Sequence, residues 1–157
     1  MLEIHIQKAL KPDAERINEV MKAAFKEYSK VASPIAANGA FSETIEDTLN
    51  DIQSCQIFYK AVCDGDIVGS VRVRINGKNG YLSRFSVLPE YQRYGIGHIL
   101  IDNVDEAMKD AKAETLTLHT CLDATHLVKF YTSYGFEIIG EESSRGYRRG
   151  TFIKKYK

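Results

Sequence analysis

The chain has 157 residues with 21 basic and 21 acidic side chains, a length that suits one domain with a substantial core. Because the charges balance, no overall field attracts the chain to nucleic acid or a membrane surface, and no apolar run approaches the ~20 residues that cross a bilayer. The three cysteines lack the spacing of a disulfide framework, which favours reduced thiols. The first residues alternate like a strand and do not show the basic-then-apolar pattern of a signal region, which favours the cytoplasm. We therefore expect a single domain over residues 1–157, cytoplasmic, with no nucleic-acid or membrane partner.

The N-terminal third predicts one strand, two helices and a loop between the helices. Residues 2–6 alternate apolar and polar side chains, which is typical of a strand. Residues 12–28 begin with proline and acidic residues and continue with apolar side chains every three or four positions, as in a helix that faces a core. Residues 31–42 lose this periodicity and predict a loop of the kind that carries variable contacts. Residues 44–54 predict a short second helix.

The middle of the chain predicts three strands that follow one another. Residues 57–63, 67–75 and 80–88 carry the alternating apolar pattern of strands. Asp64-Gly65 predicts the first turn between them and Asn76-Gly77 the second. Such a meander is typical of an antiparallel sheet.

The C-terminal half continues with helices and strands in alternation. A helix begins near residue 97, residues 115–120 alternate as a strand, residues 124–134 are helical, and residues 136–139 and 147–156 close the sheet. The expected fold class is α/β, a single domain with a mixed, mostly antiparallel twisted sheet of about six to seven strands flanked by about four helices.

The segment between the third middle strand and the next helix carries the strongest functional signal. An apolar strand stops at Pro89, and two glycines spaced as Gly95-x-Gly97 precede an amphipathic helix. Glycines let a ligand approach the backbone, and the unpaired N–H groups of a first helical turn point toward an anion. Arg93 and His98 bracket the glycines with further donors. The pattern predicts a diphosphate site, and the alternative is a tight turn without a ligand.

The order of residues narrows the kind of site. A dinucleotide-binding fold requires a third glycine where Leu100 stands, and no Gly-Lys-Ser/Thr triplet of a P-loop occurs. The segment Gln92-Arg93-Tyr94-Gly95-Ile96-Gly97 resembles the Q/R-x-x-G-x-G/A signature of the GCN5-related N-acetyltransferase (GNAT) family. Downstream, Phe130-Tyr131-Thr132-Ser133-Tyr134-Gly135-Phe136 is similar to the F-Y-x-x-x-G-F element of that family.

This resemblance implies the acyl-CoA N-acyltransferase fold and a function. The function is acetyl-CoA-dependent N-acetylation of a primary amine by direct transfer in a ternary complex, without a metal. The acceptor is a small-molecule amine or a peptide or protein amine, and a homodimer is the assembly that relatives often form. The implied coenzyme-binding residues are Phe85, Ser86, Val87, Gln92, Arg93, Tyr94, Gly95, Ile96, Gly97 and His98.

Acetyl transfer to an amine needs a base, fixed donors for the oxyanion and an acid for the departing thiolate. The resemblance implies that Tyr131 is the general acid, and the alternative is a core aromatic residue. His119 is the candidate base, because imidazole collects a proton near neutral pH and several relatives carry a glutamate near this point of the strand. The alternative for His119 is a hydrogen-bonded strand histidine or a residue that shapes the substrate site.

Further implications concern the backbone and one departure from the family. In the family, pantetheine inserts like an added strand where two strands part, and the backbone of Phe85, Ser86 and Val87 would line it. The N–H of Val87 is a candidate oxyanion donor. Many relatives have an asparagine at the start of the last helix, near the pantetheine arm, where this chain has Ala124. The contact of that side-chain amide with the arm is therefore missing or replaced in this chain.

Other reactive residues and other functions carry weaker signals. Cys121 lies two residues from His119, but no third residue of a Cys–His acyl-transfer site is identifiable. The basic segment 145–149 is either solvated hairpin surface or a site for an acidic acceptor or a coenzyme phosphate. The histidines are too scattered to predict a metal site. The competing functions are a non-catalytic acyl-CoA-binding domain and, less favoured, a nucleotide-binding protein of another fold.

Overall fold

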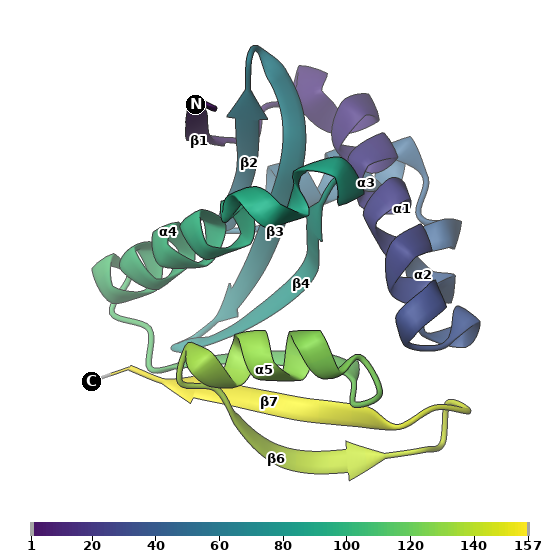
Figure 1. Cartoon of the computed structure of the whole chain (residues 1–157). Coiled ribbons are helices and arrows are strands. Elements are labelled where there is room, and N and C mark those ends of the chain that lie inside the picture. The colour runs from purple at the N-terminus through teal and green to yellow at the C-terminus, as the bar shows by residue number, and fades with distance from the viewer. Residues whose placement is uncertain (1, 157) are drawn as a thin grey trace.

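The computed structural model describes residues 2–156 and contains one seven-stranded sheet with helices on both faces (Figure 1). The strands are β1 (Ile4–Lys8), β2 (Ile57–Cys63), β3 (Asp66–Asn76), β4 (Asn79–Val87), β5 (Thr115–Cys121), β6 (Glu137–Glu142) and β7 (Arg149–Lys155). The helices are α1 (Ala14–Val31), α2 (Asn38–Ser42), α3 (Ile45–Ser54), α4 (Ile96–Asp110) and α5 (Thr125–Ser133), with 3₁₀ turns η1 (Lys11–Asp13), η2 (Pro34–Ala37) and η3 (Pro89–Tyr94).

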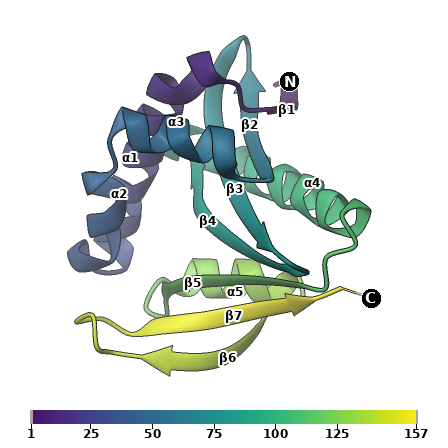
Figure 2. The same cartoon turned by 180° about the vertical axis from the view of Figure 1, so that it is seen from behind.

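The strands lie in the order β1-β2-β3-β4-β5-β7-β6, and every neighbouring pair is antiparallel except β4 and β5. Helices α4 and α5 cover one face of the sheet, whereas α1, α2 and α3 lie on the other, as the view from behind shows (Figure 2). The predicted mixed, mostly antiparallel α/β sheet is therefore confirmed. Within the described residues α2 adds one short helix beyond the four that the sequence predicts.

The one parallel pairing in the sheet is short, and this shapes the molecule. Strands β4 and β5 pair only at Asn79 with Thr115, Gly80 with Leu116 and Tyr81 with Thr117. Beyond Tyr81 the two strands part, which leaves a V-shaped opening between the two halves of the sheet (Figure 1). The hydrogen-bonding edges of both strands then face this opening instead of each other.

A bulge in β4 accompanies the separation. Opposite β3, the pairing shifts between Ser70 and Arg72, and Arg84 has a φ of 50°, in the left-handed region. Bulges of this kind bend a strand and increase its twist, so the second half of β4 turns away from β5. The periodic pattern of the sequence does not reveal the bulge, because residues 80–88 read as a regular strand.

Three details of the predicted elements need correction. Residues 31–42, predicted as a loop, form η2 and α2, because Pro34 is tolerated in a first helical turn and Ser42 bonds back to the carbonyl of Asn38. The first strand lies at Ile4–Lys8 instead of residues 2–6, since register with β2 fixes it. In the β3–β4 hairpin, Asn76 pairs with Asn79, so the two loop residues are Gly77-Lys78 rather than Asn76-Gly77.

The other helices and strands begin and end close to their predicted positions. Helix α3 begins with a capping box, in which the Thr44 hydroxyl accepts from the amide of Asp47 at 3.0 Å and the Asp47 carboxylate accepts from the amide of Thr44 at 2.9 Å. Helix α4 buries its apolar face against the sheet, including Ile96, Leu100 and Val104. In the part of the chain that the structure describes, no helix is both long and apolar enough to span a bilayer.

Candidate active site

A cleft of about 700 Å³ runs through the opening between β4 and β5. Its walls come from α1, from the η2–α2 segment, from β4 and β5, and from α5. The loop between β6 and β7 also contributes, and there Gly146 lies against Ile35 of η2. Residues that are distant in the sequence therefore meet only because the sheet is split.

The turn before α4 has the geometry that an anion site requires. Gly95 has a φ of 77°, which lets the chain leave η3 and begin α4 directly. The first helical bond runs from the amide of Ile99 to the carbonyl of Gly95 at 3.2 Å. The amides of Ile96, Gly97 and His98 precede this bond, so the helix itself supplies them with no acceptor. Their N–H groups and the positive end of the helix dipole lie together at this turn.

The two glycines of the motif have different roles. A side chain on Gly95 would meet no atom within 4 Å, so Gly95 is needed for its backbone conformation. A Cβ on Gly97 would lie 3.1 Å from Cζ of Phe85 and 3.6 Å from Cζ of Phe130. Gly97 therefore lets two aromatic rings, which stack with their centroids 5.6 Å apart, approach the start of the helix. The motif alone does not distinguish these roles.

The predicted coenzyme-binding residues fall into two groups. Phe85, Val87, Gln92 and Gly97 line the cleft. The other predicted residues do not line it. Ser86 is a buried residue of β4, and the rest lie on the turn before α4 or in its first residues; they are Arg93, Tyr94, Gly95, Ile96 and His98.

Several of these side chains contact protein groups. Ser86 is buried and donates to the carbonyl of Arg84 at 2.9 Å, so only its backbone can reach a ligand in the opening. His98 Nδ1 lies 2.9 Å from the hydroxyl of Tyr134, so the imidazole is held against α5. Gln92 Nε2 donates to the carbonyl of Val87 at 3.1 Å and ties η3 to the end of β4.

The amide of Val87 faces the opening. The next amide, that of Leu88, donates to the carbonyl of Val68 on the β3 side at 2.8 Å. Successive N–H groups of a strand point to opposite edges, so the N–H of Val87 points toward β5, where β5 has already turned away. This orientation suits the predicted role of Val87 as a backbone donor to a ligand in the opening.

Tyr131 lies at the floor of the cleft on α5. Its ring packs against Phe85, Phe136 and Phe152 with centroid separations of 6.2, 5.7 and 6.0 Å, and only 5% of the residue is exposed. Burial raises the pKa of the Tyr131 phenol far above its usual value of 10, and the nearby Tyr28 phenol adds to the rise. The hydroxyl is therefore protonated at every physiological pH, as a proton donor must be.

His119 lies on the opposite face of β5 from Tyr131. Leu118 pairs with Phe152, whose side chain packs on Tyr131, so the alternation of strand side chains directs His119 away from α5. Nδ1 of His119 lies 2.7 Å from the hydroxyl of Tyr81. Burial, followed by the guanidinium of Arg149, lowers the pKa of His119 below its usual 6.5, which keeps the imidazole neutral at pH 7.

The structure thus brings both predicted catalytic residues to one cleft from two sides of the sheet. It also adds Tyr81 and Tyr28, which the sequence analysis missed. Tyr81 pairs with Thr117 and thus lies beside His119, but alternation within each strand does not reveal this pairing of distant segments. Tyr28 carries no functional signal in the sequence either, since it sits on the apolar stripe of α1 and reads as core.

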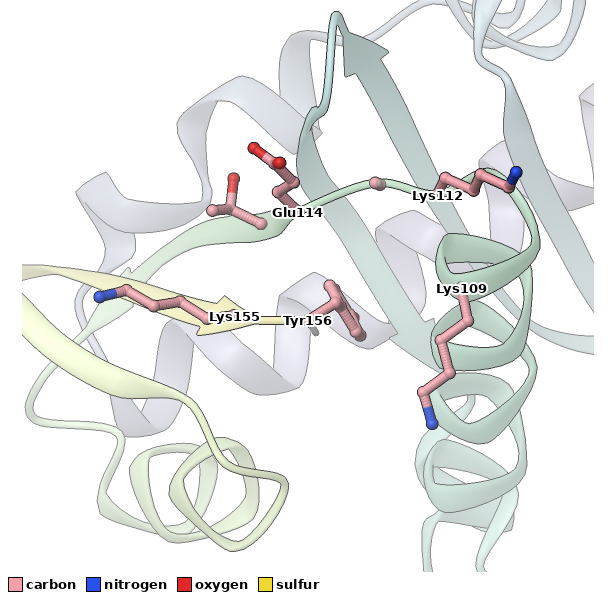
Figure 3. Close-up of a pocket in the computed structure, with 7 residues that line it drawn as sticks. Lys109, Lys112, Glu114, Lys155 and Tyr156 are labelled. Atoms are coloured by element: carbon pink, nitrogen blue, oxygen red, sulfur yellow. The ribbon is translucent and has the colours of Figure 1, made fainter.

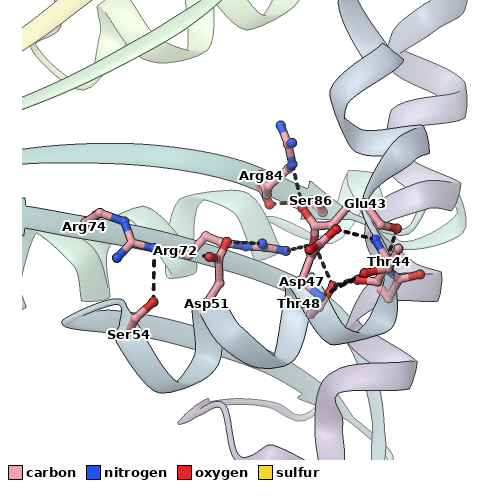
Figure 4. Close-up of polar contacts among 11 residues, drawn as sticks. Glu43, Thr44, Asp47, Thr48, Asp51, Ser54, Arg72, Arg74, Arg84 and Ser86 are labelled. Atoms are coloured by element: carbon pink, nitrogen blue, oxygen red, sulfur yellow. Dashed lines mark hydrogen bonds and ion pairs between the residues drawn. The ribbon is translucent and has the colours of Figure 1, made fainter.

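A buried ion network fixes the bulge of β4 to α3 (Figure 4). Glu43 lies between two arginines, with Nη2 of Arg72 3.0 Å from Oε2 and Nε of Arg84 3.0 Å from Oε1. Asp51 then joins Arg72 at 2.7 Å and Arg74 at 3.2 Å. Arg72 is fully buried and its guanidinium lies 4.8 Å from the ring centroid of Phe58. Arg84, a residue of the cleft wall with a left-handed backbone, is one end of this network.

A second depression, of about 460 Å³, lies between the C-terminal end of α4 and the start of β5 (Figure 3). Lys109, Lys112 and Lys155 surround it, together with Glu114 and Tyr156. It is at the far end of α4 from the Gly95–Gly97 turn and contains none of the predicted site residues. Among the described residues no cluster of three or more His, Cys, Asp or Glu side chains could hold a metal ion.

The comparisons with known proteins agree on one family. The family model for the acetyltransferase (GNAT) domain matches residues 17–155. A predicted acetyltransferase of Bacillus subtilis is 31% identical over 125 residues, which cover 79% of this chain and 76% of that protein. N-alpha-acetyltransferase 50 of Danio rerio is 26% identical over 129 residues, which cover 79% of this chain and 73% of that protein.

The solved structures agree as well. The PaiA N-acetyltransferase of Thermoplasma acidophilum, determined in complex with coenzyme A, has a TM-score of 0.84 at 25% identity and covers 98% of this chain and 99% of that one. The split sheet and the glycine turn define the class of acyl-CoA N-acyltransferases. This chain belongs to the GNAT family of acetyltransferases and is an N-acetyltransferase.

Proposed function

We propose that the protein transfers the acetyl group of acetyl-CoA directly to a primary amine of a small molecule or peptide while both are bound. The observation that carries this proposal is the cleft through the opening between β4 and β5, which Tyr131 and His119 reach from opposite faces of the sheet. Direct transfer needs such an arrangement, because the thioester and the amine approach each other from two sides.

The residues of the opening fit the chemistry of the coenzyme. The free amides of Ile96, Gly97 and His98 suit a pyrophosphate, with Arg93 beside them as a cation on the exposed turn. The N–H of Val87 suits either an amide of the pantetheine arm or the carbonyl oxygen that becomes an oxyanion. Phe85 and Phe130 give the arm an apolar wall.

The proton transfers follow from the two catalytic candidates. His119 accepts a proton from the ammonium of the acceptor, through Nε2, while Nδ1–H donates to the hydroxyl of Tyr81. The amine nitrogen then forms a bond to the thioester carbon, the carbon–sulfur bond breaks, and the nitrogen releases its second proton, which restores the Tyr131 phenol after Tyr131 has protonated the leaving group. Tyr131 donates its proton to the departing thiolate, which releases coenzyme A as the thiol.

Thiol release with a panel of amines tests the proposal. We expect acetyl-CoA and at least one primary amine together to release free coenzyme A and form the N-acetyl product, which mass spectrometry identifies. We also expect calorimetry to detect binding of acetyl-CoA in the absence of any amine. Binding without turnover across a broad panel would instead indicate a non-catalytic acyl-CoA-binding domain, and absence of binding would refute both functions.

A further inference from the structure

Three guanidinium groups line the same cleft as His119. Arg145 and Arg149 come from the β6–β7 loop and the start of β7, and Arg84 comes from the bulge of β4. The same three arginines lower the pKa of Tyr81 against the larger, opposite effect of its burial. The Tyr81 hydroxyl lies 2.7 Å from Nδ1 of His119, and Arg149 and Arg145 also lower the pKa of His119 itself, so these two charges lie close to the candidate base.

The carboxylates nearby do not balance these arginines. Arg149 and Arg145 share Glu142, at 3.3 and 3.8 Å, and Arg84 shares Glu43 with Arg72. Arg72 also pairs with Asp51, which is in turn shared with Arg74. Three carboxylates therefore face five guanidinium groups, which leaves an excess of positive charge on this side of the cleft.

Glu27, a carboxylate that lines the cleft, does not remove this excess of positive charge. Its Oε1 is already paired with the ammonium of Lys30 at 2.9 Å. An amine acceptor arrives as a cation, because an alkyl ammonium has a pKa of ~10. A simple cationic amine would therefore be repelled from this region unless the same molecule carried a compensating negative charge.

Arg149 lies on the wrong face of the sheet to serve the Gly95–Gly97 turn. Phe152 packs on Tyr131 beneath α5, and Arg149, three residues earlier in the same strand, projects to the other face. The turn at Gly95–Gly97 opens α4, which lies on the α5 face (Figure 1). The charge excess therefore faces the side from which the acceptor would enter.

We propose that the acceptor is an amino-carboxylate, an amine that carries a carboxylate a few bonds away, and that Arg149 and Arg145 bind this carboxylate. The inference rests on the proposed function, because it names the substrate class of the same cleft. A guanidinium binds a carboxylate with two parallel hydrogen bonds, which would also orient the amine toward His119. Arg149 and Arg145 thereby determine specificity without taking part in the proton transfers.

Matched acceptor pairs test this proposal. Each pair is an L-amino acid and its primary amide, which have the same skeleton and differ only in the negative charge. At neutral pH the amide has more free amine, so greater nucleophile availability cannot produce a preference for the acid. For the amino acid that reacts fastest, we expect kcat/KM to be at least about tenfold higher for the acid than for its amide. A hydrogen bond to a charged group typically produces an effect of this size.

Single substitutions in the β6–β7 hairpin show which arginines cause the preference for the acid over the amide. Arg149→Gln and Arg145→Gln should each reduce the ratio of acid to amide kcat/KM severalfold, mainly through KM for the acid. Arg148→Gln is the control, because Arg148 lies between them in the sequence but pairs with Glu141 and Asp123, at 3.2 and 3.4 Å, and does not line the cleft. It should keep the wild-type ratio.

The outcomes separate this proposal from the function on which it rests. Turnover of the amides or of polycations at rates equal to or above those of the acids would overturn the amino-carboxylate proposal and leave N-acetyl transfer intact. An unchanged ratio in both Arg149→Gln and Arg145→Gln would overturn the assignment of the arginines. Calorimetric binding of acetyl-CoA with no turnover of any amine would refute the proposed function itself.

Discussion

The phenol oxygen of Tyr28 on α1 accepts a hydrogen bond from the backbone amide of Cys121 on β5 at 2.9 Å. The next amide of the strand, that of Leu122, donates to the carbonyl of Arg148 on the other side at 2.8 Å, so the amide of Cys121 points into the opening. Tyr28 therefore replaces the strand partner that β5 loses where β4 turns away. A helix side chain satisfies a buried backbone donor and helps keep the sheet split.

Removing this hydroxyl should destabilise the split sheet. In Tyr28→Phe the amide of Cys121 loses its acceptor within the protein, and the free energy of unfolding should fall by about 1–2 kcal/mol. Urea unfolding measures this change. Tyr59→Phe, which alters a half-buried tyrosine of β2 outside the cleft, is the control and should change stability less. Equal effects of the two substitutions would contradict the role assigned to Tyr28.

Tyr131→Phe should lower kcat by about tenfold or more, because general acid catalysis contributes at least that much. Acetyl-CoA affinity should stay close to wild type, since the ring contacts with Phe136 and Phe152 remain. Single-turnover kinetics and calorimetry measure the two quantities. Because burial raises the pKa of Tyr131, wild-type kcat should show no alkaline decline from this group below pH 10. An unchanged kcat in the variant would exclude Tyr131 from the mechanism.

His119 should produce the acidic limb of the pH profile. Its pKa lies below 6.5, so the imidazole is neutral at pH 7 and kcat/KM should fall only as the pH drops through that lowered value. His119→Gln should lower the rate and remove this limb. Tyr81→Phe removes the partner of Nδ1 and should reduce the rate less than His119→Gln. If the variant without the imidazole kept the same acidic limb, another group would be the base.

Gly95→Ala should weaken both the fold and coenzyme binding. The space around a new Cβ is open, so the cost is that of the left-handed backbone, about 1 kcal/mol for a residue with a side chain. Relaxation of the turn would also misalign the amides of Ile96 and Gly97, so the Kd for coenzyme A should rise. Gly95→Asn provides the comparison, because asparagine tolerates this conformation better. An alanine variant as stable as the wild type would contradict the assigned role.

Glu43→Gln should destabilise the protein strongly. Burial alone would raise the pKa of Glu43, but Arg72, Thr48 and Arg84 outweigh it and hold the pKa below its usual 4.5. The stabilisation is therefore complete above pH 4.5 and is lost as the pH falls through the lowered value. The substitution leaves two arginines short of a partner, and we expect a loss of about 3 kcal/mol at pH 7, measured by urea unfolding.

The pH dependence gives an internal check on this assignment. Wild type should lose its advantage over Glu43→Gln as the pH falls below 4.5, because protonation of Glu43 makes the two proteins alike. A stability difference that is constant from pH 7 to pH 3 would show that the charge of Glu43 does not matter.

Local sequence determined most of the fold. The alternation in residues 57–88 and the apolar stripes of α1 and α4 depend on periods of two and 3.6 residues, so strands and helices follow from neighbouring side chains. The glycine turn was predicted from a short continuous motif, and the role of Tyr131 was implied by the resemblance of a second short motif to the GNAT family. Residues 31–42 were mispredicted because tertiary contacts with α1 stabilise helical turns that show no periodicity of their own.

Only the tertiary structure decided what surrounds the reacting groups. The separation of β4 from β5 depends on a bulge at Arg84 and on an ion network whose members lie up to 41 residues apart. The pairing of Tyr28 with Cys121 spans 93 residues, and the arginines that line the cleft come from β4, from β7 and from the loop before β7. A chain specifies its local conformation through adjacent residues. Where charges accumulate and which backbone donors stay open depends on which distant segments the packing brings together.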